Sequence, residues 1–239
     1  MVRRDSVLCS AAHGPLPGLL LALTVVTGAI DAVSILRLGR VFVANMTGNV
    51  VFAGFAAVGA PGFALGSSLV ALAGFLAGAA LGGWLATRFH TDRAAVLLAG
   101  CVAEIALSAT ALVIAASVAN LTAAGGRYSL SALLAATMGI QNAAVRHLKV
   151  PDLTTTVLTM TLTGIATDVR DGDWRKPPMR RRLAAVVAMV GGAAAGAELV
   201  LHRSATADLV LVVAILALVT VGTAIARAYD RGEWRRLPA

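Results

Sequence analysis

Two carboxyl groups lie inside long apolar stretches of this sequence, where an acid is a candidate for proton or cation chemistry. Asp31 falls in the second half of the first stretch, and Glu104 lies eleven residues into the fourth. An ionised carboxylate in an apolar layer is costly, so such a group normally faces the protein interior and has a partner. We expect Asp31 either to bind a proton or cation or to pair with Arg37 or Arg40. Glu104 has no basic residue within two helical turns, so we expect a proton relay or a carboxyl group hydrogen-bonded to another helix.

A segment with the sequence VFVANMTGNVV is the best candidate for a binding site. Its polar residues Asn45, Thr47 and Asn49 are spaced by two, so on a regular helix they spread over about 200° and cannot all avoid lipid. If Gly48 breaks the helix, these side chains and the freed carbonyl groups line a cavity, because irregular backbone inside a membrane needs protein or water around it. The alternative is a polar helix packed inside a bundle and hydrogen-bonded to its neighbours.

A second polar segment, 153–169, is rich in threonine. Thr155, Thr159 and Thr163 share one face of a helix, where their hydroxyl groups form either a polar path or a tight seam between helices. A threonine hydroxyl can also bond to the carbonyl one turn earlier, which lowers the cost of placing it in lipid. The candidate ligands in this half of the chain are Gln141, Asn142, Thr155, Thr156, Thr159 and Thr163.

These two polar segments occupy matching positions in an internal repeat. Residues 28–51 read GAIDAVSILRLGRVFVANMTGNVV and residues 139–162 read GIQNAAVRHLKVPDLTTTVLTMTL, 111 residues further on. Such a repeat in a membrane protein indicates two structural halves, and sites form at the seam between them. Asn142 takes the place of Asp31, so we expect the first half to supply charge and the second half hydroxyl groups.

The elements that position these residues are membrane helices. Apolar residues make up 58% of the 239, charged residues 13%, and the mean hydropathy is +0.83, whereas a soluble domain carries about 25% charged residues. The sequence predicts an all-α, polytopic membrane protein in the lipid bilayer. The net charge of +8 lies in loops, where it sets topology rather than binding nucleic acid. The predicted apolar segments are 18–36, 41–58, 64–86, 94–118, 129–147, 153–169, 182–201 and 207–226.

The basic residues favour six crossings over eight. Eight crossings with the N-terminus inside leave 13 Lys and Arg inside and 7 outside, whereas six crossings, with 41–58 and 153–169 re-entrant or broken, leave 16 inside and 4 outside. Each half then has three crossings, so the two halves are inverted. We expect a multi-pass membrane protein with both termini cytoplasmic. Its parts are an N-terminal tail 1–17, a first repeat 18–118, a linker 119–128, a second repeat 129–226 and a C-terminal tail 227–239.

Other residues point to packing rather than chemistry. The glycine faces are expected to pack the bundle or a homodimer. Glu198 and His202, one turn apart, are expected to pair at the interface, and a disulfide between Cys9 and Cys101 is not expected. Trp174 and the arginines around it are expected to hold a connection at the membrane surface. We expect no metal, no cofactor and no enzymatic activity, because the histidines are scattered and no catalytic set occurs at a plausible depth. The glycine faces comprise Gly74, Gly78, Gly82, Gly192 and Gly196.

The two repeated strings resemble the signature stretches of the YoaK-like bacterial membrane proteins, over nearly the whole chain from about Leu19 to Arg227. One departure is Met160, which stands where a glycine echoing Gly48 is expected. The family is functionally uncharacterised, so the resemblance implies a class, a topology and a place in the bacterial inner membrane, but no mechanism. The residues that carry it are Asp31, Asn45, Thr47, Gly48, Asn49, Gln141, Asn142, Pro151, Thr155, Thr156, Thr159 and Thr161.

The predicted function is a small-solute secondary transporter or permease. Paired interrupted segments in matching positions indicate a transport site. We expect the site between the two polar segments near the midplane, with a small polar solute as ligand and with Asp31 and Glu104 coupling protons. The alternative is a membrane interaction or assembly protein that acts through helix packing.

Overall fold

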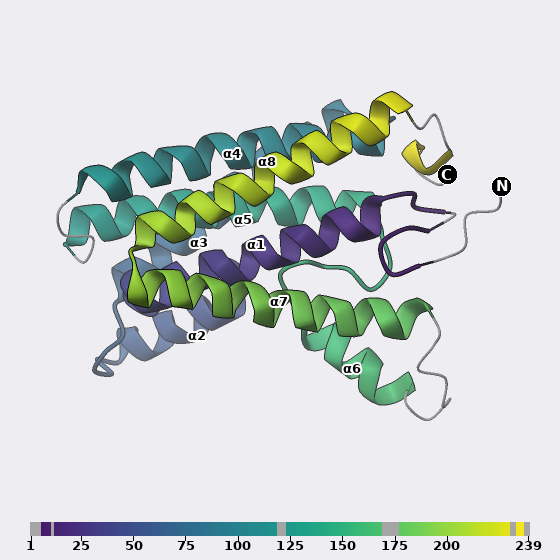
Figure 1. The fold of residues 1–239 in the computed structure, drawn as a ribbon. Coiled ribbons are helices and arrows are strands. Elements are labelled where there is room, and N and C mark those ends of the chain that lie inside the picture. Colours follow the sequence, from purple (N-terminus) through teal and green to yellow (C-terminus); the bar gives the residue numbers. More distant parts are fainter. Residues whose placement is uncertain (1–5, 11, 119–122, 169–176, 230–232, 237–239) are drawn as a thin grey trace.

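The computed structural model describes residues 6–10, 12–118, 123–168, 177–229 and 233–236. This part of the chain contains eight α-helices and a 3₁₀ turn, Glu233–Arg235, so the predicted all-α class is confirmed (Figure 1). Trp174 and part of the predicted linker 119–128 lie outside the described residues. The helices are α1 (Leu16–Arg37), α2 (Met46–Ala57), α3 (Leu65–Arg88), α4 (Arg93–Ser117), α5 (Ala124–Leu148), α6 (Thr159–Asp168), α7 (Pro177–His202) and α8 (Ala205–Tyr229).

Five of these helices, α1, α3, α4, α7 and α8, are long and apolar enough to cross a membrane. Helix α5 has 25 residues but carries Arg127, Gln141, Arg146 and His147, which lower its hydropathy. Large apolar side chains cover the outside of the bundle; Leu218, for example, is 71% exposed. An apolar outer surface on long helices is what a bilayer requires, so the polytopic membrane character is confirmed.

One end of the bundle gathers the start of α1, the start of α4 and the ends of α5 and α8. Buried Arg93 donates hydrogen bonds to the carbonyl oxygens of Leu148 and Trp234. The ring of Trp234 lies against Gly14, just before α1. We call this the Leu148 end.

Asp92 caps α4 at the Leu148 end and also pairs with arginines from the C-terminal part of the chain. Its carboxylate accepts hydrogen bonds from the amides of Ala94 and Ala95 and pairs with Arg227 and Arg235. Burial alone would raise the pKa of Asp92, but the hydrogen bonds from Arg235 and Ala95, with the charges of both arginines, hold it below the usual value.

The opposite end, which we call the Arg37 end, gathers the end of α1, the starts of α3 and α5, and the end of α7. Arg37 donates a 2.9 Å hydrogen bond to the carbonyl oxygen of Val200. Gly66 in the first turn of α3 lies against the hydroxyl of Tyr128 in the first turn of α5. Consecutive long helices therefore run in opposite directions along the bundle (Figure 1).

Glycines allow two helix pairs, α3 with α5 and α1 with α7, to approach until backbones touch. A Cβ atom added to Gly78 would lie 2.0 Å from the carbonyl oxygen of Ala136, and one added to Gly192 would lie 2.2 Å from that of Val25. The glycine faces therefore pack inside the bundle, which confirms the first of the two expectations for them.

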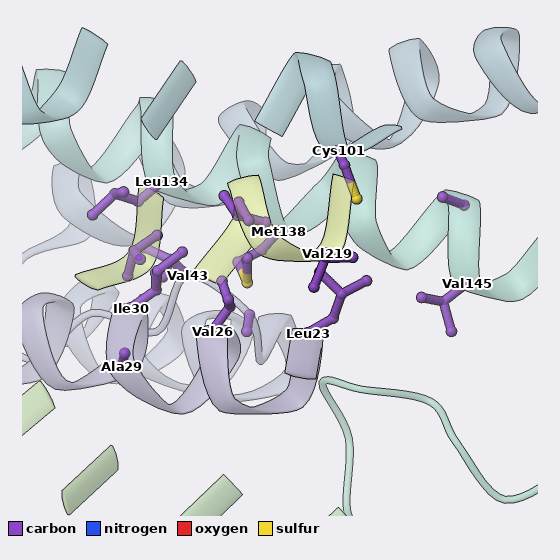
Figure 2. Close-up of a cluster of buried hydrophobic side chains, with 14 of the residues drawn as sticks. Leu23, Val26, Ala29, Ile30, Val43, Cys101, Leu134, Met138, Val145 and Val219 are labelled. Atoms are coloured by element: carbon purple, nitrogen blue, oxygen red, sulfur yellow. The ribbon is translucent and has the colours of Figure 1, made fainter. Parts of the chain in front are cut away.

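The core between these pairs is apolar. Leu23, Val26 and Ile30 of α1 face Leu134 and Met138 of α5 (Figure 2). Cys101 of α4 and Val219 of α8 close the same cluster. Both Cys9 and Cys101 are free thiols, as expected.

The chain between α1 and α2, residues 38–45, is non-helical and is largely buried apart from Gly39 and Arg40; we call it the first lead-in. Leu38, Val41 and Val43 in it are almost inaccessible. It runs back along α1, and α2 then returns toward the Arg37 end, where α3 begins (Figure 1). Helix α2 therefore begins inside the bundle and has only 12 residues.

The break before α2 lies at Asn45 and not at Gly48, which corrects the sequence-based expectation. Gly48 is the third residue of α2 and lies against the ring of Phe42. The fully buried Asn49 accepts a hydrogen bond from the amide of Phe42 and donates one to its carbonyl oxygen, at 3.0 and 2.5 Å. The side chain of Asn49 thus pairs with backbone groups of the lead-in that would bond to neighbouring turns if the segment were helical.

Residues 149–158 form a second non-helical lead-in, which precedes α6. Helix α6 begins at Thr159 and has 10 residues, so Thr155 is not on the helix. Arg182 of α7 pairs with Asp152 in this lead-in at 2.7 Å and with Asp168 at the end of α6 at 2.5 Å. Because one arginine holds both carboxylates, the second polar segment enters and leaves the bundle at the Leu148 end.

Candidate functional site

The first lead-in contacts the middle of α1 directly, and the second is linked to α1 through Gln141 of α5. The amide nitrogen of Gln141 in α5 donates hydrogen bonds to the hydroxyls of Thr27 in α1 and Thr155 in the second lead-in, each at 2.9 Å. The carbonyl oxygen of Gln141 is buried and has no hydrogen-bond partner in the described residues. One turn further along α1, the backbone amides of Val43 and Ala44 in the first lead-in face the carboxyl group of Asp31.

The carboxyl group of Asp31 is only partly satisfied by these amides. Its Oδ1 atom is buried without a partner in the described part of the chain, although the residue as a whole is partly buried. Arg37 bonds to the backbone of Val200, and the structure gives no ion pair between Asp31 and either Arg37 or Arg40 among the described residues. The pairing alternative for Asp31 therefore finds no support among the described residues, and the expectation of a proton- or cation-binding group stays a prediction.

Asn142, which matches Asp31 in the repeat, meets the second lead-in. Its side-chain oxygen accepts a 2.8 Å hydrogen bond from the hydroxyl of Thr156, and its amide donates to the carbonyl oxygen of Met138. A cavity of about 380 Å³ lies at this junction, near the lower limit for small-molecule sites. Its lining combines amide, hydroxyl, basic and aliphatic side chains: Asn142, Val145, Arg146, Lys149, Val150, Leu153, Thr154, Thr156 and Val157.

The backbone around this cavity is unusual. Lys149, Asp152 and Thr155 all have positive φ angles, of 50°, 66° and 60°. Such a conformation is costly for residues other than glycine, above all for a β-branched threonine. Clusters of this kind persist where the surrounding structure holds them, and they are found mainly at functional sites. Here the hydrogen bond from Gln141 and the ion pair with Arg182 hold the lead-in in place.

A second cavity of about 330 Å³ adjoins α6. Thr161, Thr163 and Thr167 line it together with the ion pair of Asp152 and Arg182. It lies beside the first cavity, because Thr154 lines both. The second lead-in therefore has a hollow on either side.

Three predicted site residues, Thr47, Thr159 and Thr163, are exposed. The hydroxyl of Thr163 donates to the carbonyl of Thr159 one turn earlier, and Thr163 lines the second cavity. Asn45 is the N-cap residue of α2, but its side chain makes no capping hydrogen bond. The face proposed from the spacing of Thr155, Thr159 and Thr163 does not line the interior, because the helix begins only at Thr159.

Two buried carboxyl groups lie in α4 and α8. Glu104 is 1% exposed and its Oε2 atom has no partner among the described residues, so its predicted interior position is confirmed. Asp208 is fully buried beside Gly196, and neither of its oxygens has a partner there. Sequence reasoning missed Asp208, because an acid in the first turn of a helix also occurs at interfaces. Glu198 and His202 pair at 3.4 Å, as expected.

Arg146, Lys149 and Arg182 were also missed as site residues. They were counted as basic loop residues that set topology, although Arg146 and Lys149 lie close in sequence to Asn142 and Asp152. All three residues lie beside a lead-in, and this position depends on where the helices end. Within the described ranges, no three His, Cys, Asp or Glu side chains gather as metal ligands.

Long apolar helices around two short ones, each preceded by a partly buried non-helical segment, define a multi-pass α-helical membrane protein. Comparison with known families gives a more specific assignment. The family described as "Protein of unknown function (DUF1275)" matches residues 19–222, and the chain belongs to this family.

A curated relative agrees with this assignment. The chain is 34% identical over 152 residues to the UPF0700 transmembrane protein YoaK of Bacillus subtilis (strain 168). The aligned part covers 63% of this chain and spans 66% of that relative's length. The resemblance inferred from the repeated strings is thereby confirmed. No solved structure matches the chain.

Proposed function

We propose that this protein is a secondary transporter or permease for a small solute, built from two inverted halves. Each half contributes three crossings and one re-entrant segment, with α5 as the sixth crossing. The observation that carries the proposal is the pair of short helices, α2 and α6, whose lead-ins are joined to neighbouring turns of α1, the first directly at Asp31 and the second through Gln141 at Thr27. Transport sites form where discontinuous helices from two repeats meet. The proposal involves no chemical change in the solute.

Equivalent contacts between helices support the division of the chain into two related halves. Gly28 of α1 lies against the carbonyl oxygen of Met189 in α7, and Gly139 of α5 lies against that of Phe75 in α3. Gly28 and Gly139 are 111 residues apart, while Phe75 and Met189 are 114 apart. A three-residue insertion between these helices accounts for the difference. Each half therefore packs its first long helix on the second long helix of the other half.

The distribution of charge supports the orientation. In the described part of the chain, ten Lys and Arg residues lie toward the Leu148 end and four toward the Arg37 end. By the positive-inside rule, the Leu148 end is then cytoplasmic, and so are the tails next to α1 and α8. The four at the Arg37 end are Arg37, Arg40, Arg127 and Arg203, and the ten are Arg88, Arg93, Arg146, Lys149, Arg180, Arg181, Arg182, Arg227, Arg235 and Arg236.

The lead-ins support a solute path through the bundle. Helices α2 and α6 do not pack on each other in the described structure, and they lie against α3 and α7. The path is therefore assigned to the lead-ins, near Asp31 and Gln141, rather than to the space between the two short helices. Non-helical backbone at membrane depth occurs where it lines such a path or is covered by protein.

Within this proposal, transport of the solute is coupled to protons. Asp31 and Glu104 each have a buried oxygen with no partner in the described residues. A carboxyl group in this setting takes up and releases a proton when a path to water opens. Flux driven by a pH gradient should therefore fall in Asp31→Asn or Glu104→Gln. Equal flux in both variants and the parent protein would remove the coupling mechanism.

Cysteine labelling tests the topology. In a chain without Cys9 and Cys101, an impermeant maleimide should label Val58→Cys in intact cells. Thr91→Cys should react only after permeabilisation. Both positions are exposed, Val58 by 84%. The opposite pattern would contradict the proposed orientation, in which the end of α2 faces outward and the turn between α3 and α4 faces the cytoplasm.

Stopped-flow swelling of proteoliposomes tests transport without a labelled substrate. Vesicles with the protein should admit at least one class among small organic anions, amino acids and sugars faster than empty vesicles. No acceleration for any class, together with co-purification of a stoichiometric partner, would contradict transport and favour an assembly role.

A further inference from the structure

The cavity of about 380 Å³ at the second lead-in carries two basic side chains with no acidic partner. Arg146 and Lys149 are exposed, line the cavity and make no ion pair in the described structure. The nearby carboxylate of Asp152 is already paired with Arg182. The cavity therefore has an uncompensated positive charge.

The inner wall of the cavity is polar and well ordered by hydrogen bonds. Thr156 is 6% exposed and its hydroxyl donates to Asn142, which in turn donates to the carbonyl of Met138. Aliphatic side chains, including Val145, Val150 and Leu153, complete the lining. Basic groups at the mouth and aliphatic groups beside them suit an anionic head with a short apolar part.

We propose that this cavity binds a small organic anion. Arg146 and Lys149 bind its charged head, and the aliphatic wall packs against its short carbon chain. The anion is the substrate class of the transporter proposed above, so this inference rests on that function. Guanidinium and ammonium groups bind carboxylates and phosphates through charge-assisted hydrogen bonds. A phospholipid headgroup offers the same chemistry at a membrane interface, so the test includes both sources.

The comparison of the two halves separates this site from a general excess of basic residues. At a spacing of 111, Arg146 and Lys149 correspond to Ile35 and Leu38, and Asn142 corresponds to Asp31. At these matching positions the first half thus has a carboxyl group and no base, whereas the second half has two bases and no carboxyl group. The second lead-in is suited to an anion and the first to a proton or cation.

Thermal stability of the full chain in lipid nanodiscs measures binding, because a ligand of the folded state raises the melting temperature in a saturable way. The soluble probes are butyrate and inorganic phosphate, in nanodiscs of phosphatidylcholine. The lipid probe is phosphatidylglycerol added to the same nanodiscs. The variant is Arg146→Gln with Lys149→Gln. The matched control is Arg88→Gln with Arg180→Gln, which removes two exposed charges from the same end but none from the cavity.

We expect butyrate to stabilise the parent and the control, and the apparent affinity to fall about a hundredfold in the cavity variant, since each lost charged hydrogen bond weakens binding about tenfold. Stabilisation by phosphatidylglycerol alone, again lost only in the cavity variant, would assign the anion site to a lipid headgroup. No saturable shift from any probe, or equal weakening in variant and control, would overturn the proposal. If the double variant does not fold, each single variant is compared with the control in the same way.

Flux measurements keep this inference separate from the proposed function. Butyrate binding that depends on Arg146 and Lys149, without flux of any solute, would leave the anion site and remove transport. Flux that is unchanged by the cavity variant would leave transport and remove the anion site.

Discussion

Gly78→Ala should destabilise the protein, because α3 and α5 touch through their backbones at this position. The added methyl group would lie 2.0 Å from the carbonyl oxygen of Ala136 and 2.6 Å from its Cα atom. Methyl carbons in proteins are not found closer than 3.0 Å to such atoms. The two helices must therefore separate locally by about 1 Å, since backbone atoms cannot rotate away as a side chain can.

The cost can be estimated from two opposing effects. Overpacking of a tight interface costs about 1–3 kcal/mol, and replacing glycine by alanine in a helix returns up to about 1 kcal/mol. The net expectation is a destabilisation of about 1–2 kcal/mol, which for a chain of this size lowers the melting temperature by about 2–8 °C.

Gly83→Ala is the matched control. Gly83 lies five residues further along α3, and a Cβ atom added there meets nothing within 4 Å. This variant should melt at or slightly above the temperature of the parent protein. The assay is the loss of monodisperse protein after heating in detergent, followed by size-exclusion chromatography. If Gly78→Ala melts as high as Gly83→Ala, then α3 and α5 do not approach as described.

Three further perturbations test the lead-ins and the Leu148 end. Asn49→Ala leaves the amide and carbonyl of Phe42 unpaired, so the free energy of unfolding should fall by about 2–4 kcal/mol. A fall below about 0.5 kcal/mol, as for a surface substitution, would contradict this pairing. Asp92→Asn keeps the helix cap but loses the pair with Arg235, at a cost of about 1 kcal/mol near pH 7. The pKa of Asp92 is lowered in the folded protein, so the stabilisation that its charge provides is complete above the unfolded pKa of about 3.9. This stabilisation is lost as the pH falls below that value through the lower folded pKa. The melting temperatures of variant and parent should therefore converge only below about pH 3.9. Arg182→Gln removes both ion pairs that hold α6, so hydrogen exchange in α6 should become about tenfold faster, and unchanged exchange would show that other contacts hold it.

The number and order of the helices could be predicted from the sequence, because the cost of exposing polar groups to lipid confines them to the ends of long apolar runs. All eight predicted segments correspond to helices. The two polar segments were expected to be short, and they are shorter still. Their helices begin only at Met46 and Thr159, because the lead-ins take up the first part of each segment.

The positions of the breaks could not be predicted. Gly48 was the natural choice, since glycine is the weakest helix former in that segment. The helix instead starts two residues earlier, where the side chain of Asn49 bonds to the backbone of Phe42. A contact between a side chain and a backbone seven residues away depends on the folded path, and no local propensity encodes it.

The candidate site could be predicted only in part, because its contacts also depend on the folded path of the chain. Gln141 and Thr155, both predicted as candidate ligands, are hydrogen-bonded to each other. The outward position of Thr163 follows from the late start of α6, which no periodicity indicated. Arg146 was assigned to topology because its charge explains the orientation of the chain equally well.

The packing of α1 against α7 also matters while the chain is being made. About 140 residues separate the end of α1 from the start of α7, which at roughly 5–20 residues per second is a delay of roughly 7–28 s. During this time α1 has no partner for the glycine face around Gly28. Its threonines already bond to their own helix, Thr24 to Leu20 and Thr27 to Leu23. The first helix can therefore wait in lipid with its hydroxyl groups satisfied, and the first half of the chain completes its packing only when the second half arrives.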